Sequence, residues 1–185
     1  KSTLEAQAMP PIKLITLGNN DVSKFEIGNE TVMFRHEEKF RNPTGVGFII
    51  DDGFKDEEIK LLLNKINQLK FERVGQKLEV NLVAIKQNKD AERFLKAVEL
   101  VLNNTALPIM LMSSDLACLR EVAQSAKERK PLLYCATKDN LRQIGQLAKD
   151  FDLTLVVSAK DIDALSKLTK ELNLLGVNNL ILDTG

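Results

Sequence analysis

Polar and charged side chains follow most of the short apolar runs in this 185-residue sequence. Five of them are of types that bind or polarise small polar ligands: Asp51, Lys86, Ser113, Asp115 and Asp183. If the apolar runs are parallel strands of one sheet, their carboxyl ends meet at one edge, and these residues form a rim around a single site. Asp51-Asp52 and Asp183 could then shift each other's pKa and bracket a proton or a polar substrate.

A structural role competes with this chemistry at the rim. Asp51 and Asp52 precede a predicted helix, where a carboxylate accepts free backbone N–H groups and favours the positive end of the helix dipole. Asp115 follows Ser113 and Ser114 in the position of an N-cap. Lys86 could hold an anionic group, but a lysine at a helix start is also commonly just solvated. For Asp51, Asp52 and Asp115 we predict helix capping, with ligand binding as the alternative.

The residues that most often hold metals are few. His36 is the only histidine, and its charged neighbours in RHEEKF predict a solvated or ion-paired imidazole. Cys118 and Cys135 lie in separate apolar segments without Cys-x-x-Cys spacing, which predicts two buried thiols and no disulfide. We therefore assign no catalytic residue and no metal ligand from the sequence.

Strands and helices that would position the rim alternate after Pro43. Apolar runs typical of strands covered on both faces lie at 46–50, 79–85, 108–112, 131–135, 153–157 and 179–183. Amphipathic helical stretches lie between them, at 59–69, 94–102, 116–126, 141–148 and 162–172. Asp90, Asp115, Thr137 and either Ser158 or Asp161 are the expected N-caps, and Gly176 is expected to end the last helix.

Two α/β architectures use such units, an open doubly wound sheet and a closed (β/α)8 barrel. The last five strands recur about every 22 to 27 residues, and no Gly-x-Gly-x-x-Gly turn follows the first strand. Both features favour the TIM-barrel type. Because a barrel needs eight strands, the predicted barrel is incomplete, with about six strands present and two βα units expected beyond Gly185.

The segment before the first barrel strand has a different pattern. In FEIGNETVMFRHE, at 25–37, two short alternating runs flank Gly28-Asn29, a pair suited to positive φ, and predict a β-hairpin to which 14–17 could add a strand. We expect this hairpin to cover the bottom of the barrel, with Phe25, Ile27 and Phe34 packed against the N-terminal ends of its strands. The sequence thus divides into an N-terminal segment, 1–43, and a partial βα barrel, 44–185.

Composition limits the partners and the location. The 26 Lys and Arg residues equal the 26 Asp and Glu residues, so no net field attracts nucleic acid or an anionic membrane. No apolar run reaches the roughly 20 residues of a spanning helix, and the first residues lack the order of a signal peptide. A cytoplasmic protein is expected. The start at Lys1 and the end at Leu-Asp-Thr-Gly are typical of a piece of a longer polypeptide.

Two stretches carry a resemblance to a known family: KSTLEAQAMPPIKLITLG at 1–18 and FEIGNETVMFRHEEKFRNP at 25–43. Together they resemble the large (gamma) subunit of the corrinoid/iron-sulfur protein of the acetyl-CoA synthase/decarbonylase pathway, and the similarity continues through the βα units. The resemblance implies a three-part subunit, with a four-iron four-sulfur cluster domain, a central barrel and a corrinoid domain. It also implies a heterodimer with a smaller barrel subunit.

In that family the corrinoid carries a methyl group from a methyl-pterin donor to acetyl-CoA synthase, so the cofactor supplies the hard chemistry. Neither cysteine of this chain belongs to the family's cluster motif, and no residue is carried over as a cluster ligand or a corrinoid contact. The expected cofactors are therefore none in this chain, and a corrinoid and a cluster in the parent.

The resemblance predicts a scaffold that docks the small subunit, within a parent that also meets a methyl-pterin methyltransferase and acetyl-CoA synthase. The chain alone is not expected to be catalytic. Two alternatives remain, a self-contained barrel enzyme that binds a pterin-like ligand at the rim, and a pure interaction module.

Overall fold

The computed structural model describes residues 13–19, 23–28 and 44–185. Its main sheet has six strands in the order β10-β9-β8-β7-β6-β3, and every neighbouring pair is parallel. The strands are β3 (Gly47–Asp51), β6 (Leu82–Lys86), β7 (Ile109–Met112), β8 (Leu132–Ala136), β9 (Leu155–Ser158) and β10 (Leu180–Asp183). The helices that connect them are α2 (Asp56–Gln68), α3 (Ala91–Asn104), α4 (Leu116–Ser125), α5 (Leu141–Phe151) and α6 (Ile162–Leu174).

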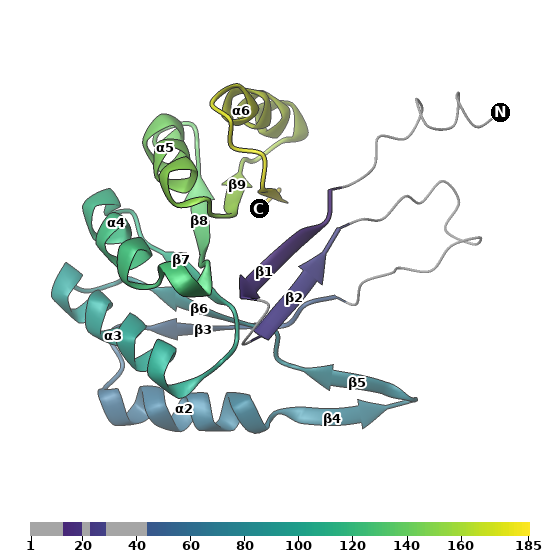
Figure 1. The fold of residues 1–185 in the computed structure, drawn as a ribbon, viewed down its shortest axis with the longest axis vertical. Coiled ribbons are helices and arrows are strands. Elements are labelled where there is room, and N and C mark those ends of the chain that lie inside the picture. Colours follow the sequence, from purple (N-terminus) through teal and green to yellow (C-terminus); the bar gives the residue numbers. More distant parts are fainter. Residues whose placement is uncertain (1–12, 20–22, 29–43) are drawn as a thin grey trace.

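The order of the strands decides between the two predicted architectures. Neighbours follow one another in chain order without a reversal, whereas a doubly wound sheet needs a point at which the order switches. Crossovers between parallel strands are right-handed, and here each one leads to the next strand in the same direction across the sheet. All the helices therefore lie on one face of a curved sheet (Figure 1). This is the wall of a βα barrel. The predicted α/β fold with six parallel strands and five helices is confirmed, but the sheet is not closed among the described residues, since β3 and β10 are its two edges.

The main core lies between the sheet and the five helices. Alternate strand residues such as Ile85, Leu111 and Leu133 point to this side and are fully buried. The helices bury the apolar stripes that the sequence predicts, represented by Phe94 on α3 and Ile144 on α5. The apolar stripes of the helices thus pack against the apolar side chains on one face of the sheet.

Most of the predicted helix ends are confirmed. The side chains of Asp90, Asp115 and Asp161 accept backbone N–H groups in the first turns of α3, α4 and α6, and Gly176 has a φ of 89° just after α6. The prediction for Thr137 is wrong, because α5 begins at Leu141 and its N-cap is Asn140. The Asn140 side chain instead accepts the backbone N–H of Thr137 at 2.8 Å, which extends the turn before the helix.

A two-stranded hairpin lies on the face of the sheet opposite the helices (Figure 1). It pairs β1 (Ile15–Asn19) with β2 (Ser23–Ile27) in antiparallel register, with Leu17 opposite Phe25. Within the described residues β2 therefore pairs with β1, which overlaps the run 14–17 that the sequence predicted only as an additional strand. The partner predicted for it, around Val32 to Phe34, lies outside the described residues, as does His36.

The hairpin contributes to a second, smaller core. Ile15 and Leu17 are buried against Leu132 and Val156 at the start of β8 and β9. Gly18 makes the close approach possible: its φ is 82°, and a Cβ there would lie 2.9 Å from Cγ of Pro108, just before β7. The apolar face of the hairpin thus covers the N-terminal part of the concave side of the sheet.

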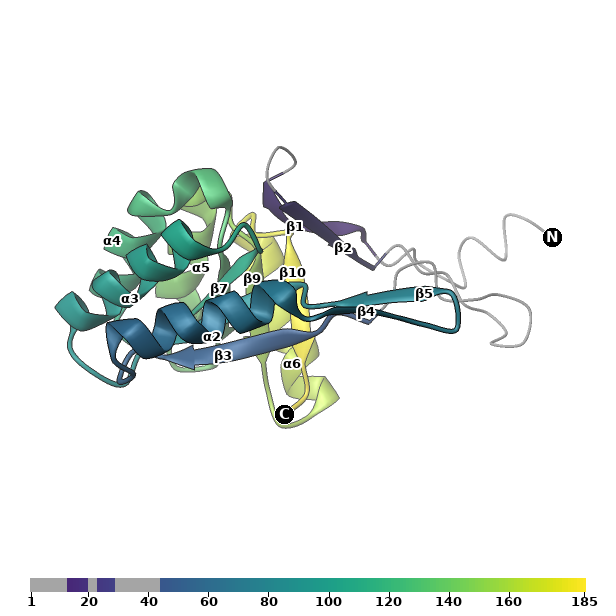
Figure 2. The same cartoon turned by 90° about the horizontal axis from the view of Figure 1, so that it is seen from below.

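A second hairpin was not predicted. Residues 70–79, here called the arm, form β4 (Lys70–Arg73) and β5 (Gln76–Glu79) between α2 and β6. The arm projects away from the body of the molecule (Figure 2). The sequence predicted one strand over 79–85, whereas in the structure Glu79 ends β5 and the rest of the run is mainly β6. The arm was missed because Val74-Gly75 is an unusual turn pair that gives no hairpin signal.

Candidate functional site

All five predicted rim residues lie at the carboxyl ends of the strands or directly after them. Asp51 ends β3 and is in register with Lys86 at the end of β6, while Asp183 ends β10 at the other edge of the sheet. Ser113 and Asp115 follow β7. The hydrogen bonds divide the rim into two clusters, one around β3, β6 and β7 and the other around β8, β9 and β10.

In the first cluster Asp51 organises a turn. Its Oδ1 accepts the backbone N–H of Gly53 at 2.7 Å, and its Oδ2 accepts the side-chain amide of Asn88. The prediction that Asp51 caps the following helix is wrong, because α2 begins at Asp56 with Lys55 as its N-cap. The chain makes a full turn between the end of β3 and the helix, and the carboxylate serves that turn.

Asp52 is fully buried and joins two loops. Its carboxylate accepts the backbone N–H groups of Asn88 at 2.9 Å and Lys89 at 3.1 Å, in the loop after β6. The predicted helix cap is wrong here also, since the N–H groups belong to a different segment of the chain. A buried carboxylate with backbone donors stabilises the loop and is not available to a substrate.

Arg93 completes this loop structure and was missed by the sequence reasoning. Its Nε donates to the carbonyl of Asp52 at 2.7 Å, its Nη1 lies 2.6 Å from Oδ1 of Asp56, and its Nη2 donates to the carbonyl of Phe54. Lys96 lies 2.7 Å from the other carboxylate oxygen of Asp56. Hydrogen bonds from Lys96 and then from Arg93 lower the pKa of Asp56. No sequence motif signals an arginine that fills backbone acceptors in this way.

Ser113 and Asp115 are also used by local structure. The Ser113 hydroxyl donates to Oε1 of Gln87 and accepts the backbone N–H of Asp115 at 2.9 Å. The carboxylate of Asp115 accepts the N–H groups of Ala117 and Cys118 at 3.0 and 3.1 Å, which confirms the predicted N-cap. Lys86 has an exposed side chain. The first cluster therefore holds the loops of the rim in place.

The second cluster has a different character. The phenol of Tyr134, the only tyrosine, donates to Oδ2 of Asp183 at 3.0 Å, and Gly185 N–H donates to Oδ1 at 3.0 Å. These donors, the backbone one first, lower the pKa of Asp183. The hydrogen bond to Asp183 and then burial raise the pKa of Tyr134 to about 12. The pair thus presents an ionised carboxylate and a neutral phenol.

Tyr134 was missed because it lies inside a predicted strand rather than after one. The alternation of the run PLLYC could have found it, since Tyr134 and Leu132 lie on the same side of β8 and both contact the smaller core. Next to the pair, Ser158, Thr184 and Gly185 border an open groove of about 960 Å³ that continues along α6. Tyr134 and Asp183 do not line this groove themselves, but their neighbours in the chain and the sheet do.

The two cysteines lie on opposite faces of the sheet. Cys118 on α4 is buried in the main core, and burial raises its pKa to about 11. Cys135 on β8 packs against the smaller core, and burial raises its pKa also. An iron-sulfur cluster held by four thiolates does not fit a chain with two cysteines in these positions. The described residues contain no group of three or more His, Cys, Asp or Glu that could hold a metal ion.

Fold comparison defines the class first. The structure of dihydropteroate synthase from Thermus thermophilus aligns with a TM-score of 0.56 and 13% identity, covering 76% of this chain and 60% of that one. At this identity the likeness concerns the fold, that of a TIM barrel. Among the described residues no helix is long and apolar enough to cross a membrane.

Sequence comparison then identifies the family. The family model for the CO dehydrogenase/acetyl-CoA synthase delta subunit matches residues 14–185, and the chain belongs to this family. The corrinoid/iron-sulfur protein large subunit of Moorella thermoacetica is 35% identical over all of this chain and 42% of its own length.

Archaeal relatives are similar. Subunit gamma 2 of the acetyl-CoA decarbonylase/synthase complex of Methanosarcina mazei is 35% identical over 98% of this chain and 39% of its own length. The gamma subunit from Methanocaldococcus jannaschii is 33% identical over 94% of this chain and 36% of its own. The resemblance predicted from the sequence is confirmed, and the chain spans about two fifths of the length of these relatives. The family model is named after the delta subunit, whereas these relatives are gamma or large subunits.

Proposed function

We propose that this chain is the barrel part of a corrinoid/iron-sulfur methyl carrier and that it serves as a scaffold that docks a partner subunit. The observation that carries the proposal is the family match over residues 14–185, together with 35% identity to a corrinoid/iron-sulfur protein large subunit. The rim supports it, since the polar side chains around β3, β6 and β7 bond to their own loops. The parent would pass a methyl group from a methyl-pterin donor to acetyl-CoA synthase.

In this proposal two further βα units close the barrel. The edge strands expose apolar side chains: Ile49 of β3 is 61% exposed and Leu182 of β10 is 55% exposed. Phe48 on the other side of β3 is 41% exposed, whereas the corresponding residues of central strands are buried under helices. Exposed apolar edges favour pairing with another strand, and a TIM-type wall closes at eight.

The corrinoid and the cluster would be held by other parts of the parent. The cysteines of this chain do not suit a cluster, and we assign no corrinoid contact to it. The partners in this proposal are the small subunit for the barrel itself, and the methyl-pterin methyltransferase and acetyl-CoA synthase for the parent. The names of the archaeal relatives, which are subunits of a complex, support the expectation of partner subunits.

The test has two measurements. The parent polypeptide, purified anaerobically with its small subunit, should show corrinoid absorbance and bound iron. The 185-residue chain should bind the same small subunit in sedimentation experiments without either cofactor. A parent that contains neither corrinoid nor iron would refute the methyl-carrier role, and a chain that does not bind the small subunit would refute the docking role.

A second candidate function is a ligand site at Tyr134 and Asp183. The observation in its favour is the ionised carboxylate beside a neutral phenol and an open groove. A carboxylate of this kind can accept the N–H groups of a pterin-like ligand. Calorimetric titration with methyl-pterin should give binding that Asp183→Asn weakens at least tenfold and that the exposed control Asp152→Asn leaves unchanged. Absence of heat with the unmodified chain would eliminate this candidate.

A further inference from the structure

The arm exposes apolar side chains that the rest of the described chain does not cover. Phe71 is 59% exposed and lies opposite Leu78, which is 38% exposed. Val74 at the tip is 95% exposed. Among the described residues β4 and β5 form a sheet of two strands only, so each has an outer edge with free backbone groups. An exposed edge that carries apolar side chains is a site for pairing with another strand.

The tip of the arm is also strained. Val74 has a φ of 52° and Gly75 a φ of 73°, the backbone of a tight hairpin turn with both central residues in the left-handed region. Glycine and asparagine adopt this backbone readily, but a β-branched residue does so at a cost. An apolar residue in this position adds nothing to the described fold, and it extends the exposed apolar surface of the arm.

The charges of the arm follow a pattern that specifies its partner. Each strand contains a lysine, an apolar residue and a glutamate in this order, namely Lys70-Phe71-Glu72 in β4 and Lys77-Leu78-Glu79 in β5. Antiparallel pairing of the two triplets places Lys70 opposite Glu79 and Glu72 opposite Lys77. Nζ of Lys70 lies 3.6 Å from Oε2 of Glu79. The pattern is thus complementary to itself whenever two such strands run antiparallel.

We propose that the arms of two copies of this chain pair through the outer edges of their β4 strands. With Phe71 opposite Phe71 of the second copy at a two-fold axis, each Lys70 faces Glu72 of the other copy. The result is a four-stranded antiparallel sheet in the order β5-β4-β4-β5, with the apolar side chains of both arms on one face. Such an interface uses the same patch on both chains, as two-fold dimers do. It goes beyond the proposed scaffold function and does not depend on it.

The choice of β4 follows from the place of the arm on the molecule. Strand β5 lies on the side of the arm that faces β2, and β4 lies on the outer side (Figure 1). A small groove of about 300 Å³ between β2 and β5 is lined by Phe25, Val46 and Leu78, so the body of the same chain limits access to β5. A short interface of this kind predicts a dimer that forms in a concentration-dependent way.

Complementary charge reversal tests the pairing. In Lys70→Glu, the new carboxylate would face Glu72 of the second copy, and in Glu72→Lys, the new ammonium group would face Lys70 of the second copy. Each variant alone should therefore dimerise at least tenfold more weakly than the unmodified chain in sedimentation velocity. An equal mixture of the two should recover dimers. Positions 70 and 72 are both acidic in Lys70→Glu and both basic in Glu72→Lys, so in a mixed dimer every pair across the interface has opposite charges.

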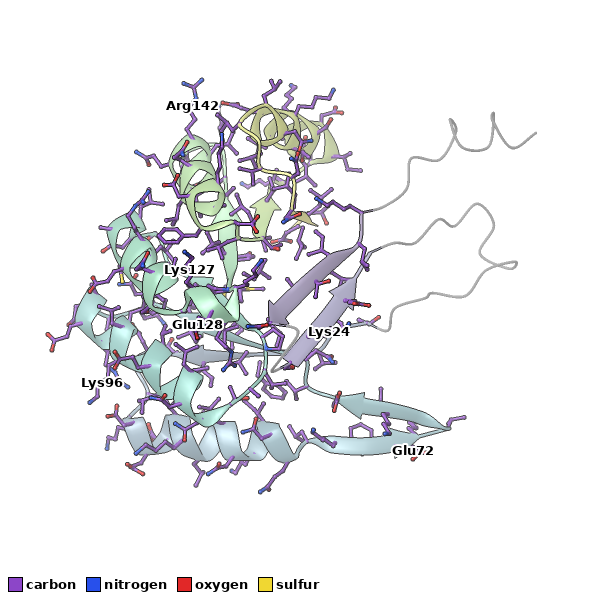
Figure 3. The ribbon with its side chains drawn as sticks, in the orientation of Figure 1. Lys24, Glu72, Lys96, Lys127, Glu128 and Arg142 are labelled. Carbon is purple, nitrogen blue, oxygen red and sulfur yellow. The ribbon has the colours of Figure 1, made fainter. Side chains whose placement is uncertain are left out.

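The controls are Lys127→Glu and Glu128→Lys, which reverse exposed charges on the 3-10 helix η1 (Lys127–Arg129), far from Glu72 on the arm (Figure 3). They should leave dimerisation unchanged, and far-UV circular dichroism should confirm that every variant is folded. A chain that is monomeric up to millimolar concentration would overturn the proposal. So would a mixture that stays monomeric, or dimers that persist in both single variants, since the contact would then lie elsewhere, for example at the open edges β3 and β10.

Discussion

At the scale of single residues, Tyr134 and Asp183 are 49 positions apart and meet through one hydrogen bond. Because this chain has only one tyrosine, its ionisation can be followed directly by the absorbance of tyrosinate. We expect a midpoint near the pKa of about 12, and a lower midpoint, nearer 10, in Asp183→Asn. Asp152→Asn, an exposed aspartate elsewhere, should leave the midpoint unchanged. A normal midpoint in the unmodified chain would show that the hydrogen bond does not form.

The same pair makes stability depend on pH in two windows. The pKa of Tyr134 is raised by folding, so its contribution is complete below about pH 10, the pKa of an unfolded tyrosine, and is lost as the pH rises through about 12. The pKa of Asp183 is lowered, so its contribution is present above the ordinary aspartate pKa and is lost in acid. Urea denaturation between about pH 9 and 12 should show a smaller loss of stability in Tyr134→Phe than in the unmodified chain.

Asp52 is the residue whose removal should cost most at the rim. Asp52→Ala would leave the part-buried N–H groups of Asn88 and Lys89 without their acceptor, and we expect a loss of roughly 2 to 4 kcal/mol in the free energy of unfolding. The exposed Asp163→Ala should change stability by less than about 0.5 kcal/mol. Urea denaturation measures both. Equal effects would mean that the Asp52 carboxylate does not accept these two hydrogen bonds.

The residue-scale predictions from sequence succeeded where the partner is local. Asp115 bonds to the N–H groups two and three positions further on, a relation that spacing alone reveals. Asp52 was assigned to the nearest helix, but its partners lie 36 and 37 positions away. Contacts across loops depend on which strands become neighbours, which residue type and spacing do not encode.

At the scale of elements, the turn of the arm offers a direct test of strain. Val74→Asn should stabilise the arm by about 1 kcal/mol, because asparagine tolerates the left-handed backbone that valine resists. Amide hydrogen exchange over residues 70–79 is the measurement, since opening of the arm need not unfold the core. Val74→Ala keeps an unfavourable residue type in the turn and should give no comparable slowing of exchange. Faster exchange in Val74→Asn would contradict the turn geometry.

The two hairpins show why elements are predicted unequally. The run Phe25 to Ile27 was correctly expected to be a strand, but a candidate turn at Gly28-Asn29 suggested a later partner, whereas β1 precedes it in the described chain. The arm carries Lys and Glu at every second position, so it lacks the continuous apolar pattern of a strand, and its turn lacks an Asn-Gly pair. By contrast, the six strands of the wall are apolar on both faces and were readily found.

At the scale of the whole molecule, the open sheet predicts a graded response to truncation of apolar side chains. Ile49→Ala and Leu182→Ala remove exposed groups and should each cost less than about 1 kcal/mol. Leu111→Ala, in the centre of the sheet and fully buried, should cost roughly 2 to 5 kcal/mol. Denaturation at low protein concentration measures all three. Large losses for Ile49→Ala or Leu182→Ala would show that the edges are already covered.

The sequence by itself determined the succession of strands and helices, most helix caps and the family. These properties reside in local periodicity, in contacts between near neighbours and in the order of residues along the chain. It also predicted that the strand ends would carry the polar rim, because strand direction alone places carboxyl ends together once the sheet is parallel.

Only the tertiary structure decided that neighbouring strands follow in chain order, which excludes the doubly wound alternative. It also decided that the rim divides into a self-bonded cluster and the pair of Tyr134 and Asp183, that the two cysteines face opposite sides of the sheet, and that the arm stands clear of the body. The physical reason is the same in each case. Strand pairing joins segments that are distant in the chain, and its register sets which side chains meet and which remain exposed.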